Sequence, residues 1–555
     1  MVGVWKLDEV ATVRVPSPKD GKIDQASREP TTLINTFKTT VARCPNDKAL
    51  SIQKDGHWVS HTWQQYYNTS QQFARGLIQV GVQPHEAVNV LGENCPEWLF
   101  TYMGTVGAGA VIAGIYGTSN AEACQHISAH CEAKVVVVSD KVQLDKYLSV
   151  LDQLPALTAL VVWNESDVPQ DSKYRVPVYS FSEFLQLGNS VNESLVEERM
   201  TVQQPGHCCS LIYTSEAALN AHPEARAAKR SVSFLPLSHS AAQLLDIHVP
   251  LVIGSEVYFA GPDALRGGLL ATLQEVRPHY FCGVPRVWEK MMDALKEKLG
   301  AAPDGLKKSL LTWAMERSGS YLEQTHMPNK WKLGTVGPPL EGTQARIDPE
   351  TGEIQYTGRH VFMGYLHDEE ATKKTVDENG WLYSGDIGEL DEDGFLSITG
   401  RLKELIITSG GENIPPVLIE NEIKAELPAL SNVMVIGEKR NYLTFLCSLR
   451  VEPDTATGAP TDKLDKVALA VAKEIGSDAT TVSDAQSCEK FRQYISDGMA
   501  RANTRAASRA QQVQKFSIIP RDFSIGGNEL TPTMKVKRSV VEKMYMENIE
   551  KMYTP

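Results

Sequence analysis

Residues 381–416 read WLYSGDIGELDEDGFLSITGRLKELIITSGGENIPP, and this stretch decides how the rest of the chain is interpreted. An apolar run ends in Ser-Gly-Asp at 384–386, and a second run occupies 395–399. The acidic sequence Asp-Glu-Asp-Gly at 391–394 lies between them. Asp-Gly between two alternating apolar runs is a strong β-hairpin signal. The pattern therefore predicts two antiparallel strands joined by a short acidic turn.

The sequence after this hairpin changes character. Gly-Arg-Leu-Lys at 400–403 interrupts the alternation, and a new apolar strand is predicted over 404–408, before a Gly-Gly turn. We interpret the interruption as a hinge between two domains.

This whole stretch resembles the signature of the adenylate-forming enzymes, which include acyl-CoA synthetases, luciferases and the adenylation domains of peptide synthetases. The resemblance implies that Asp386 binds both ribose hydroxyls of ATP, since a carboxylate accepts two strong hydrogen bonds side by side. It also implies that Arg401 reaches the same ribose and that Lys403 is the pivot of the hinge. Asp386 alone would be more typical of a turn residue, but the full run at this spacing favours the family role.

Composition is typical of a large enzyme of two or three domains. The chain has 555 residues, of which 42% are hydrophobic and 22% charged. Its formal net charge of -13 argues against a nucleic-acid-binding protein. The nine cysteines form no CxxC pair, so reduced thiols and a cytoplasmic location are expected.

Targeting signals are not evident in the sequence. The first residues contain acids and no apolar core of a signal peptide, and the final MYTP matches no prenylation or peroxisomal signal. No apolar run is long enough to span a bilayer. Any membrane contact, at the endoplasmic reticulum or elsewhere, is therefore expected to be peripheral. The sequence does not predict an oligomeric state.

The fold class predicted for the first half of the chain is α/β with a doubly wound sheet. Apolar residues at helical spacing predict a helix over 63–80, and short apolar runs predict strands at 87–91, 135–138 and 159–163. Alternation of strands and helices indicates a parallel sheet. The segment LGENCPEWLFTYMGTVGAGAVIAGIYGTSN at 91–120 resembles acyl-CoA synthetases, most closely the bubblegum type.

One cluster in this region has metal-binding residue types. His126 and His130 are one helical turn apart, between Cys124 and Cys131. The cysteines lack zinc-like spacing. We therefore prefer a solvated helix face with buried cysteines, and no metal site is predicted.

The chain departs from the family at its phosphate loop. The apolar run 211–215 is predicted to be a buried strand, and by resemblance its Thr214 and Ser215 open a loop rich in Gly, Ser and Thr that binds phosphates. Here residues 216–230 read EAALNAHPEARAAKR and contain no glycine. That composition favours a helix over a phosphate cradle. The phosphate loop is absent as written.

A second departure spans 300–333, where the family carries its adenine-binding turn and a glutamate that holds Mg²⁺. Ser-Tyr-Leu-Glu at 320–323 is too poor a match for that role, so no metal ligand is assigned. Between the departures, Pro-Leu-Ser-His matches the block whose histidine lies beside the acyl carboxylate, here His239. A lone histidine is more often structural, and only the surrounding match favours this role.

The C-terminal part continues the family pattern. Gly410 and Gly411 resemble a loop that enters the site during thioester formation. Residues 488–514 predict a helix and 516–520 a strand. LTPTMKVK at 530–537 matches the loop of the catalytic lysine, which we assign to Lys535, with Lys537 as the alternative.

The sequence thus predicts an N-terminal arm (1–30), a large domain (31–400, incomplete at 216–230 and 300–333) and a small mobile α+β domain (401–555). The resemblance implies an AMP-forming long-chain fatty acid–CoA ligase that uses ATP, Mg²⁺ and CoA. In such enzymes the small domain turns about the hinge between adenylation and thioester formation. The alternative is a catalytically impaired variant, or pseudoenzyme, that binds lipid, CoA or partners without adenylation. Two losses at one site with intact motifs around it are typical of a variant transcript or gene model.

Overall fold

The computed structural model describes residues 4–15, 27–169, 174–213, 229–261, 263–264, 268–281, 283, 287–288, 291, 332, 335–340, 342–454, 459–531 and 535–554. The chain divides into two compact units. The N-terminal unit comprises Met1–Lys296, Pro339–Ala345 and Gln355–Ser384, and the C-terminal unit comprises Glu297–Pro338, Arg346–Ile354 and Gly385–Pro555. The division after Ser384 precedes the boundary expected at 400/401, which stays a prediction, as does mobility about a hinge.

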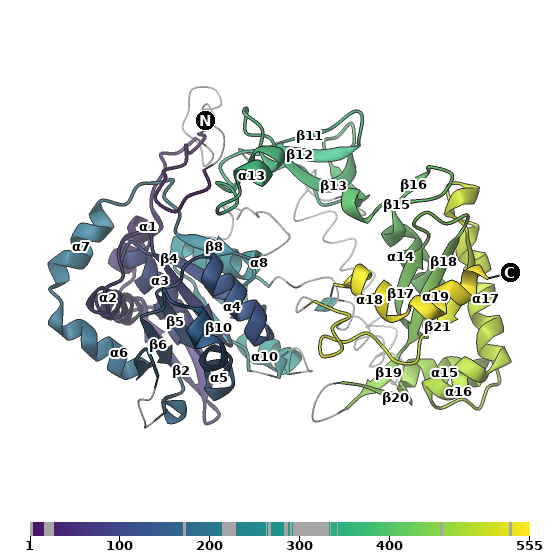
Figure 1. Cartoon of the computed structure of the whole chain (residues 1–555), viewed down its shortest axis with the longest axis horizontal. Helices are drawn as coiled ribbons and strands as arrows, with labels where there is room; N and C mark the ends of the chain where they lie inside the picture. Colours follow the sequence, from purple (N-terminus) through teal and green to yellow (C-terminus); the bar gives the residue numbers. More distant parts are fainter. Residues whose placement is uncertain are drawn as a thin grey trace, which may run out of the picture. The chain divides into compact units, whose positions relative to one another are not determined.

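A six-stranded parallel sheet lies at the centre of the N-terminal unit, in the order β7-β6-β5-β3-β4-β8 (Figure 1). Its strands are β3 (Ala87–Leu91), β4 (Val111–Ile115), β5 (Val135–Val138), β6 (Ala159–Val162), β7 (Val178–Ser180) and β8 (Ser210–Ile212). After β3 the chain adds β4 on one side and then crosses to β5 on the other. The strand order therefore reverses beside β3, which is the doubly wound topology predicted from the sequence.

Helices cover both faces of this sheet. The first and third valines of β5 belong to a core shared with α2 (Trp63–Gln79) and α3 (Pro96–Gly107). The second and fourth valines face α4 (Ala121–His130) and α5 (Lys141–Val150). Burial on both faces explains why the strand is a continuous apolar run. The helix predicted over 63–80 is confirmed as α2, and a capping box at its start fixes its first residue.

Strand β8 lies at the edge of the sheet. Among the strands that the structure describes, β8 pairs with β4 alone, and the Ile212 side chain is 38% exposed. The prediction of a buried strand is therefore wrong at this residue. Apolar composition indicated burial, but burial also needs a neighbour on the outer side, and the described residues supply none.

A second sheet of the N-terminal unit has the order β2-β1-β10-β9. Strand β1 (Lys48–Lys54) pairs antiparallel with β2 (His57–Thr62) and parallel with β10 (Glu256–Phe259), which pairs parallel with β9 (Arg230–Ser233). Further helices of the unit are α1 (Leu33–Arg43), α6 (Phe181–Leu187), α7 (Glu193–Thr201), α9 (Val249–Ile253), α10 (Leu269–Val276) and α13 (Glu369–Thr375).

The predicted hairpin belongs to a sheet with the order β11-β12-β13-β14. Its strands are β11 (Gln344–Ile347), β12 (Glu353–Thr357), β13 (Leu382–Leu390) and β14 (Leu396–Arg401). β13 and β14 are antiparallel, as predicted, and the connecting turn is closed by Asp391 Oδ1, which accepts hydrogen bonds from the backbone N–H groups of Asp393 and Phe395.

The C-terminal unit contains a three-stranded sheet with helices on both faces (Figure 1). The order is β17 (Leu430–Ile436), β18 (Leu443–Leu449) and β21 (Val513–Ile518). One face packs with α14 (Pro416–Glu426) and α17 (Glu489–Asn503), and the other with α18 (Arg538–Met544) and α19 (Met546–Tyr553). Smaller elements of the unit are β19 (Val451–Pro453), β20 (Pro460–Leu464), α15 (Lys466–Glu474) and α16 (Val482–Ser487).

The long helix expected over 488–514 is shorter than predicted. Helix α17 ends at Asn503, whose side-chain Nδ2 donates to the carbonyl of Val513 at 2.8 Å and whose Oδ1 accepts from the Val513 N–H at 2.9 Å. This side chain ties the helix end to the start of β21. The helix therefore stops, although the residues that follow are good helix formers.

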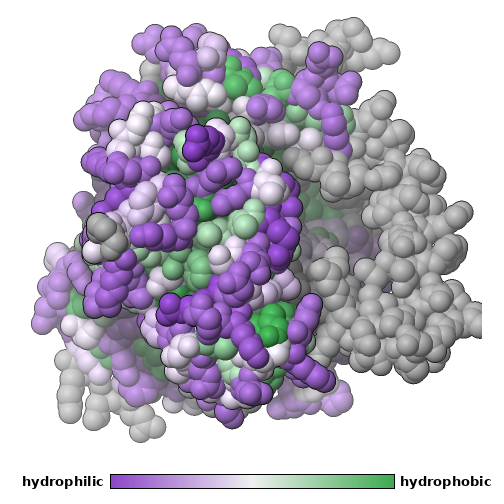
Figure 2. Space-filling model, turned by 90° about the vertical axis from the view of Figure 1, so that its right-hand side faces the viewer, coloured by the Kyte–Doolittle hydropathy of each residue, from purple (hydrophilic) through white to green (hydrophobic). Residues whose placement is uncertain are grey.

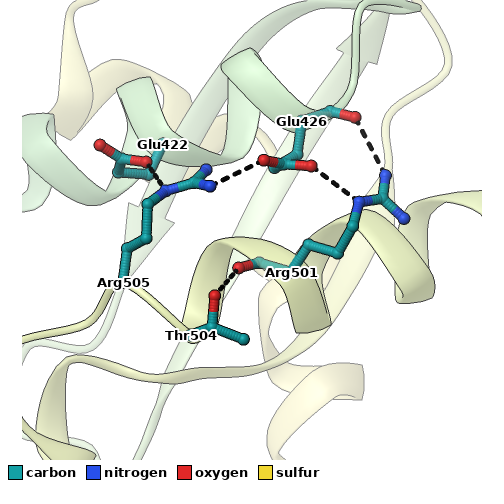
Figure 3. A network of polar contacts seen from close by, with 5 residues as sticks. All are labelled: Glu422, Glu426, Arg501, Thr504 and Arg505. Atoms are coloured by element: carbon teal, nitrogen blue, oxygen red, sulfur yellow. Dashed lines mark hydrogen bonds and ion pairs between the residues drawn. The ribbon is translucent and has the colours of Figure 1, made fainter.

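Arginines of α17 and the turn after it are paired with acids of α14 (Figure 3). Glu426 accepts hydrogen bonds from Arg501 Nε at 2.7 Å and Arg505 Nη1 at 2.8 Å, and Arg505 also pairs with Glu422. Such exposed pairs contribute little each and are weakened by salt. The network therefore orients the two helices without dominating the stability of the unit.

Figure 2 shows one face of the molecule, on which hydrophilic side chains predominate and apolar ones form small separate areas. Among the described residues, no helix combines the length and apolar character needed to cross a bilayer.

Candidate functional site

The hairpin brings Asp386 and Arg401 into contact. They are direct partners in the β13/β14 register, and Arg401 Nε lies 2.9 Å from Asp386 Oδ1. The Asp386 side chain is 25% exposed and the Arg401 side chain is 34% exposed. Burial raises the pKa of Asp386, and the guanidinium of Arg401 offsets part of that rise. The two residues that the sequence assigned to one ribose are thus adjacent.

A residue that sequence reasoning missed supports this pair. Glu353 of β12 is 9% exposed, and its Oε1 accepts the backbone N–H of Gly385 at 2.7 Å. Gly385 has φ +74°, a conformation that favours glycine, so the carboxylate fixes a turn immediately before Asp386. Burial raises the pKa of Glu353. In the sequence, this role is indicated by nothing more than an acidic residue at the start of the apolar strand EIQYT at 353–357.

The proposed pivot follows β14 directly. Lys403 lies in the one-turn 3₁₀ helix η8 (Leu402–Glu404). Just before it, a Cβ atom on Gly400 would lie 2.9 Å from Cβ of Pro415, which is too close for any side chain there. The strand continues through Gly400 and Arg401, so the break predicted from residue 400 begins at Leu402, where the 3₁₀ helix starts.

The glycine pair forms the predicted tight turn. Gly410 and Gly411 lie between β15 (Ile406–Ile407) and β16 (Asn413–Ile414), which pair antiparallel. Gly411 has φ +81°, and its N–H donates to the carbonyl of Thr408 at 2.9 Å. The turn leaves open space where a Cβ on Gly411 would point.

The loop of Lys535 is closed by backbone pairing. Thr531 N–H donates to the Lys535 carbonyl at 2.8 Å, and Lys535 N–H donates to Thr531 Oγ1 at 3.0 Å. The Lys535 side chain is exposed, yet the surrounding protein lowers its pKa by desolvation. Lys537 Nζ donates to Asn528 Oδ1 at 2.6 Å. Lys537 stays the alternative to Lys535 for the catalytic role.

His239 belongs to the N-terminal unit, whereas Asp386, Arg401, Lys403, Gly410, Gly411 and Lys535 belong to the C-terminal unit. Its side chain is 8% exposed, and its Nδ1 accepts the backbone N–H of Ala241 at 3.1 Å. Burial lowers the pKa of His239. An Nδ1 that accepts a hydrogen bond leaves the proton of the neutral ring on Nε2. The acyl-carboxylate role predicted for His239 would use this Nε2–H.

Two candidate regions lie outside the described residues. Thr214, Ser215 and the segment that follows to 228 are among them, as is most of 300–333. Within the part of the chain that is described, no group of three or more His, Cys, Asp or Glu side chains could hold a metal ion. His130 Nδ1 lies 3.0 Å from the hydroxyl of Tyr213, and Cys124 and Cys131 are buried, as the sequence indicated.

A buried carboxyl group lies near the His239 block. Asp246 is on the π-helical turn η6 (Gln243–His248) and lines a small cavity of about 10 Å³ together with Phe234 and Tyr280. Burial raises its pKa from 3.8 to about 7. Nothing in the local sequence distinguishes this acid from a solvated one, so sequence reasoning missed it.

We expect Asp246→Asn to change how stability depends on pH. Between pH 4 and 7 the unfolded chain has an ionised Asp246 while the folded chain keeps it protonated, so the folded state binds more protons and its stability falls as pH rises. The neutral amide removes this dependence. The free energy of unfolding of the variant, relative to that of the unaltered chain, should rise by about 4 kcal/mol from pH 4 to pH 7. Denaturant unfolding at each pH measures it. If the difference in unfolding free energy between the two proteins is the same at every pH, Asp246 is not protonated in the folded state over this range.

Comparisons with known proteins identify the family. The model of the AMP-binding enzyme family matches residues 37–215 and 216–366, and that of the AMP-binding enzyme C-terminal domain matches 403–483. The chain belongs to the AMP-binding enzyme family. The two matched segments of this AMP-binding enzyme meet between Ser215 and Glu216, where the phosphate loop was expected.

Curated relatives of this AMP-binding enzyme are bubblegum-type ligases, which confirms the resemblance seen in the sequence. The long-chain-fatty-acid–CoA ligase ACSBG2 of Xenopus laevis is 36% identical, over 96% of this chain and 85% of the relative. Human ACSBG1 is 36% identical, over 99% and 89%. The alignment with the Xenopus protein runs over 630 residues, more than the 555 of this chain. That relative therefore carries internal stretches that this AMP-binding enzyme lacks.

Solved structures confirm the fold. The adenylation domain of a carboxylic acid reductase from Segniliparus rugosus, in complex with AMP and a carboxylic acid, has a TM-score of 0.68 at 16% identity, covering 94% of this chain and 93% of that chain. ATP-bound MatB from Rhodopseudomonas palustris has a TM-score of 0.61 at 18% identity, covering 92% and 98%.

Proposed function

We propose that this AMP-binding enzyme is a long-chain fatty acid–CoA ligase. The observation that carries the proposal is the Asp386–Arg401 pair at the hairpin, in a chain whose curated relatives are long-chain-fatty-acid–CoA ligases. A carboxylate can accept hydrogen bonds from two ribose hydroxyls side by side, and Arg401 is held against the same carboxylate.

The reaction has two steps. A carboxylate oxygen of the fatty acid attacks the α-phosphorus of ATP, and pyrophosphate leaves to give an acyl adenylate. The sulfur of CoA then attacks the acyl carbon, loses its proton, and displaces AMP. We assign Asp386 and Arg401 to the ribose, and Thr214 and Ser215 to the phosphates.

The remaining residues are assigned to the acyl group, to the negative charge that develops at the α-phosphate, and to the movement between the two steps. The ammonium of Lys535 neutralises negative charge that develops at the α-phosphate during the first step. His239 donates a hydrogen bond to the acyl carboxylate, and the Gly410–Gly411 turn enters the site in the second step, after rotation about Lys403. Mg²⁺ is the expected counter-ion of the pyrophosphate, but we assign none of the described residues to it and no step to its chemistry.

The test is fatty-acid-dependent exchange of labelled pyrophosphate into ATP by the purified protein. The exchange reports the first step alone, where both departures from the family lie. Exchange with oleate that exceeds the rate without fatty acid supports the ligase. Folded protein without exchange would instead support the pseudoenzyme that binds lipid or CoA, and binding of labelled acyl-CoA would then be measured. Flotation with vesicles, with and without anionic lipid, tests the expected peripheral membrane contact.

A further inference from the structure

The two ends of the loop that carries Lys535 lie side by side in the C-terminal unit. Leu530 and Val536 pair across its base, and the N–H of Lys537 donates to the carbonyl of Glu529 at 2.8 Å. Leu530 and Val536 also pack against an apolar cluster that includes Tyr545. The orientation of the loop therefore depends on what holds its base.

The side chain of Glu529 is at the centre of that base. It is fully buried, at 0% exposure, and its Oε1 lies 2.5 Å from Arg521 Nη2. Its Oε2 accepts the backbone N–H of Ser524 at 3.3 Å, and the hydroxyl of Tyr545 lies 3.5 Å from Oε1. The Arg521 side chain is 46% exposed, so the pair is buried on the Glu529 side alone. Removing Arg521 would leave the buried carboxylate without its counter-charge.

The backbone is shaped around this carboxylate. A Cβ on Gly527 would lie 2.1 Å from Glu529 Oε2 and 2.9 Å from Arg521 Nη2, so a side chain there would displace the groups of this ion pair. Asn528, the next residue, has φ +68° and accepts the Lys537 ammonium through Oδ1. The chain before the loop is thus held by the side-chain contacts of Glu529, and the chain after it by the contacts of Lys537 with Glu529 and Asn528.

We propose that Glu529 is a positioning residue for Lys535, acting through Arg521. The inference rests on the proposed role of Lys535 in adenylation. A lysine in such a loop delivers its charge only where the backbone places its Cα, and a displacement of about 1 Å is enough to lower a rate about 100-fold. Glu529 and Arg521 fix that backbone at the base of the loop.

The test compares Glu529→Gln and Arg521→Gln with Glu426→Gln. Glu426 also accepts from two arginines, but on the surface between α14 and α17 (Figure 3). Both loop variants should lose pyrophosphate exchange about 100-fold, and their double variant should lose no more than either single one. Conversion of preformed oleoyl-AMP and CoA into oleoyl-CoA should stay unchanged. Glu426→Gln should retain both activities.

Equal loss of both half-reactions in the loop variants would overturn the proposal, because it would indicate general damage to the unit. Amide hydrogen exchange in the peptide covering 530–537 gives a second readout that needs no activity. Both variants should exchange faster there than the unaltered chain and Glu426→Gln. Unchanged exchange in folded variants would also overturn it. If the unaltered chain lacks pyrophosphate exchange, the ligase proposal fails, while faster amide exchange still shows that Glu529 holds the loop.

Discussion

Replacing Lys535 with alanine is expected to lower fatty-acid-dependent pyrophosphate exchange by about 100- to 1,000-fold, the range found when one group that stabilises transition-state charge is removed. Binding of ATP should change little, because the charge that the ammonium offsets develops during attack on the α-phosphate. The loss should therefore appear in kcat rather than in the KM for ATP. Steady-state exchange at varied ATP concentration measures both.

Lys537→Ala is the matched comparison for this variant. The two lysines lie two residues apart, and Lys537 already donates to Asn528 within the loop. We expect a much smaller loss for Lys537→Ala. A larger loss at Lys537 than at Lys535 would transfer the catalytic assignment to Lys537.

Replacing Asp386 with asparagine is expected to lower kcat/KM for ATP by about 10- to 150-fold, since hydrogen bonds to a charged acceptor contribute about 1.5–3 kcal/mol. An amide oxygen accepts more weakly than a carboxylate, and Arg401 loses its ion-pair partner. Exchange assays with ATP and with 2′-deoxy-ATP measure the effect. The unaltered enzyme should prefer ATP, and the variant should lose most of that preference.

Glu389→Gln is the control for Asp386→Asn. Glu389 lies on the same strand, β13, and is exposed. This change should leave the preference for ATP over 2′-deoxy-ATP intact. If Asp386→Asn also keeps the full preference, Asp386 does not bind the ribose, and its pairing with Arg401 is structural.

Local patterns predicted the elements whose burial follows from their own residues. The helix over 63–80 was found because its periodicity matches the face it buries, and the strand at 135–138 because a short continuous apolar run is typical of a strand buried on both faces. Asp386 and Arg401 were found because both match the family signature, and the register of β13 and β14 places them opposite each other. These parts of the fold and site are encoded locally.

The end of helix α17, the exposure of Ile212 and the burial of three acids depend on tertiary contacts, which the sequence does not show. Helix α17 stops at Asn503, whose side chain binds the backbone of β21, and Ile212 is exposed because β8 lies at the edge of the described sheet. The buried acids Glu353, Asp246 and Glu529 look like ordinary polar residues in the sequence. Their partners or the surfaces that bury them come from other segments, so periodicity carries no signal for them.

Among the residues that the structure describes, the two apolar clusters on either side of the β17-β18-β21 sheet consist of side chains from 406–553. Each strand and helix in them finds its packing partners inside one contiguous segment of chain. In evolutionary terms the segment is a module, because substitutions or deletions earlier in the sequence leave its internal contacts unchanged. Selection can therefore alter the earlier part of the protein while the loop of Lys535 and the carboxylate of Glu529 are inherited as one piece.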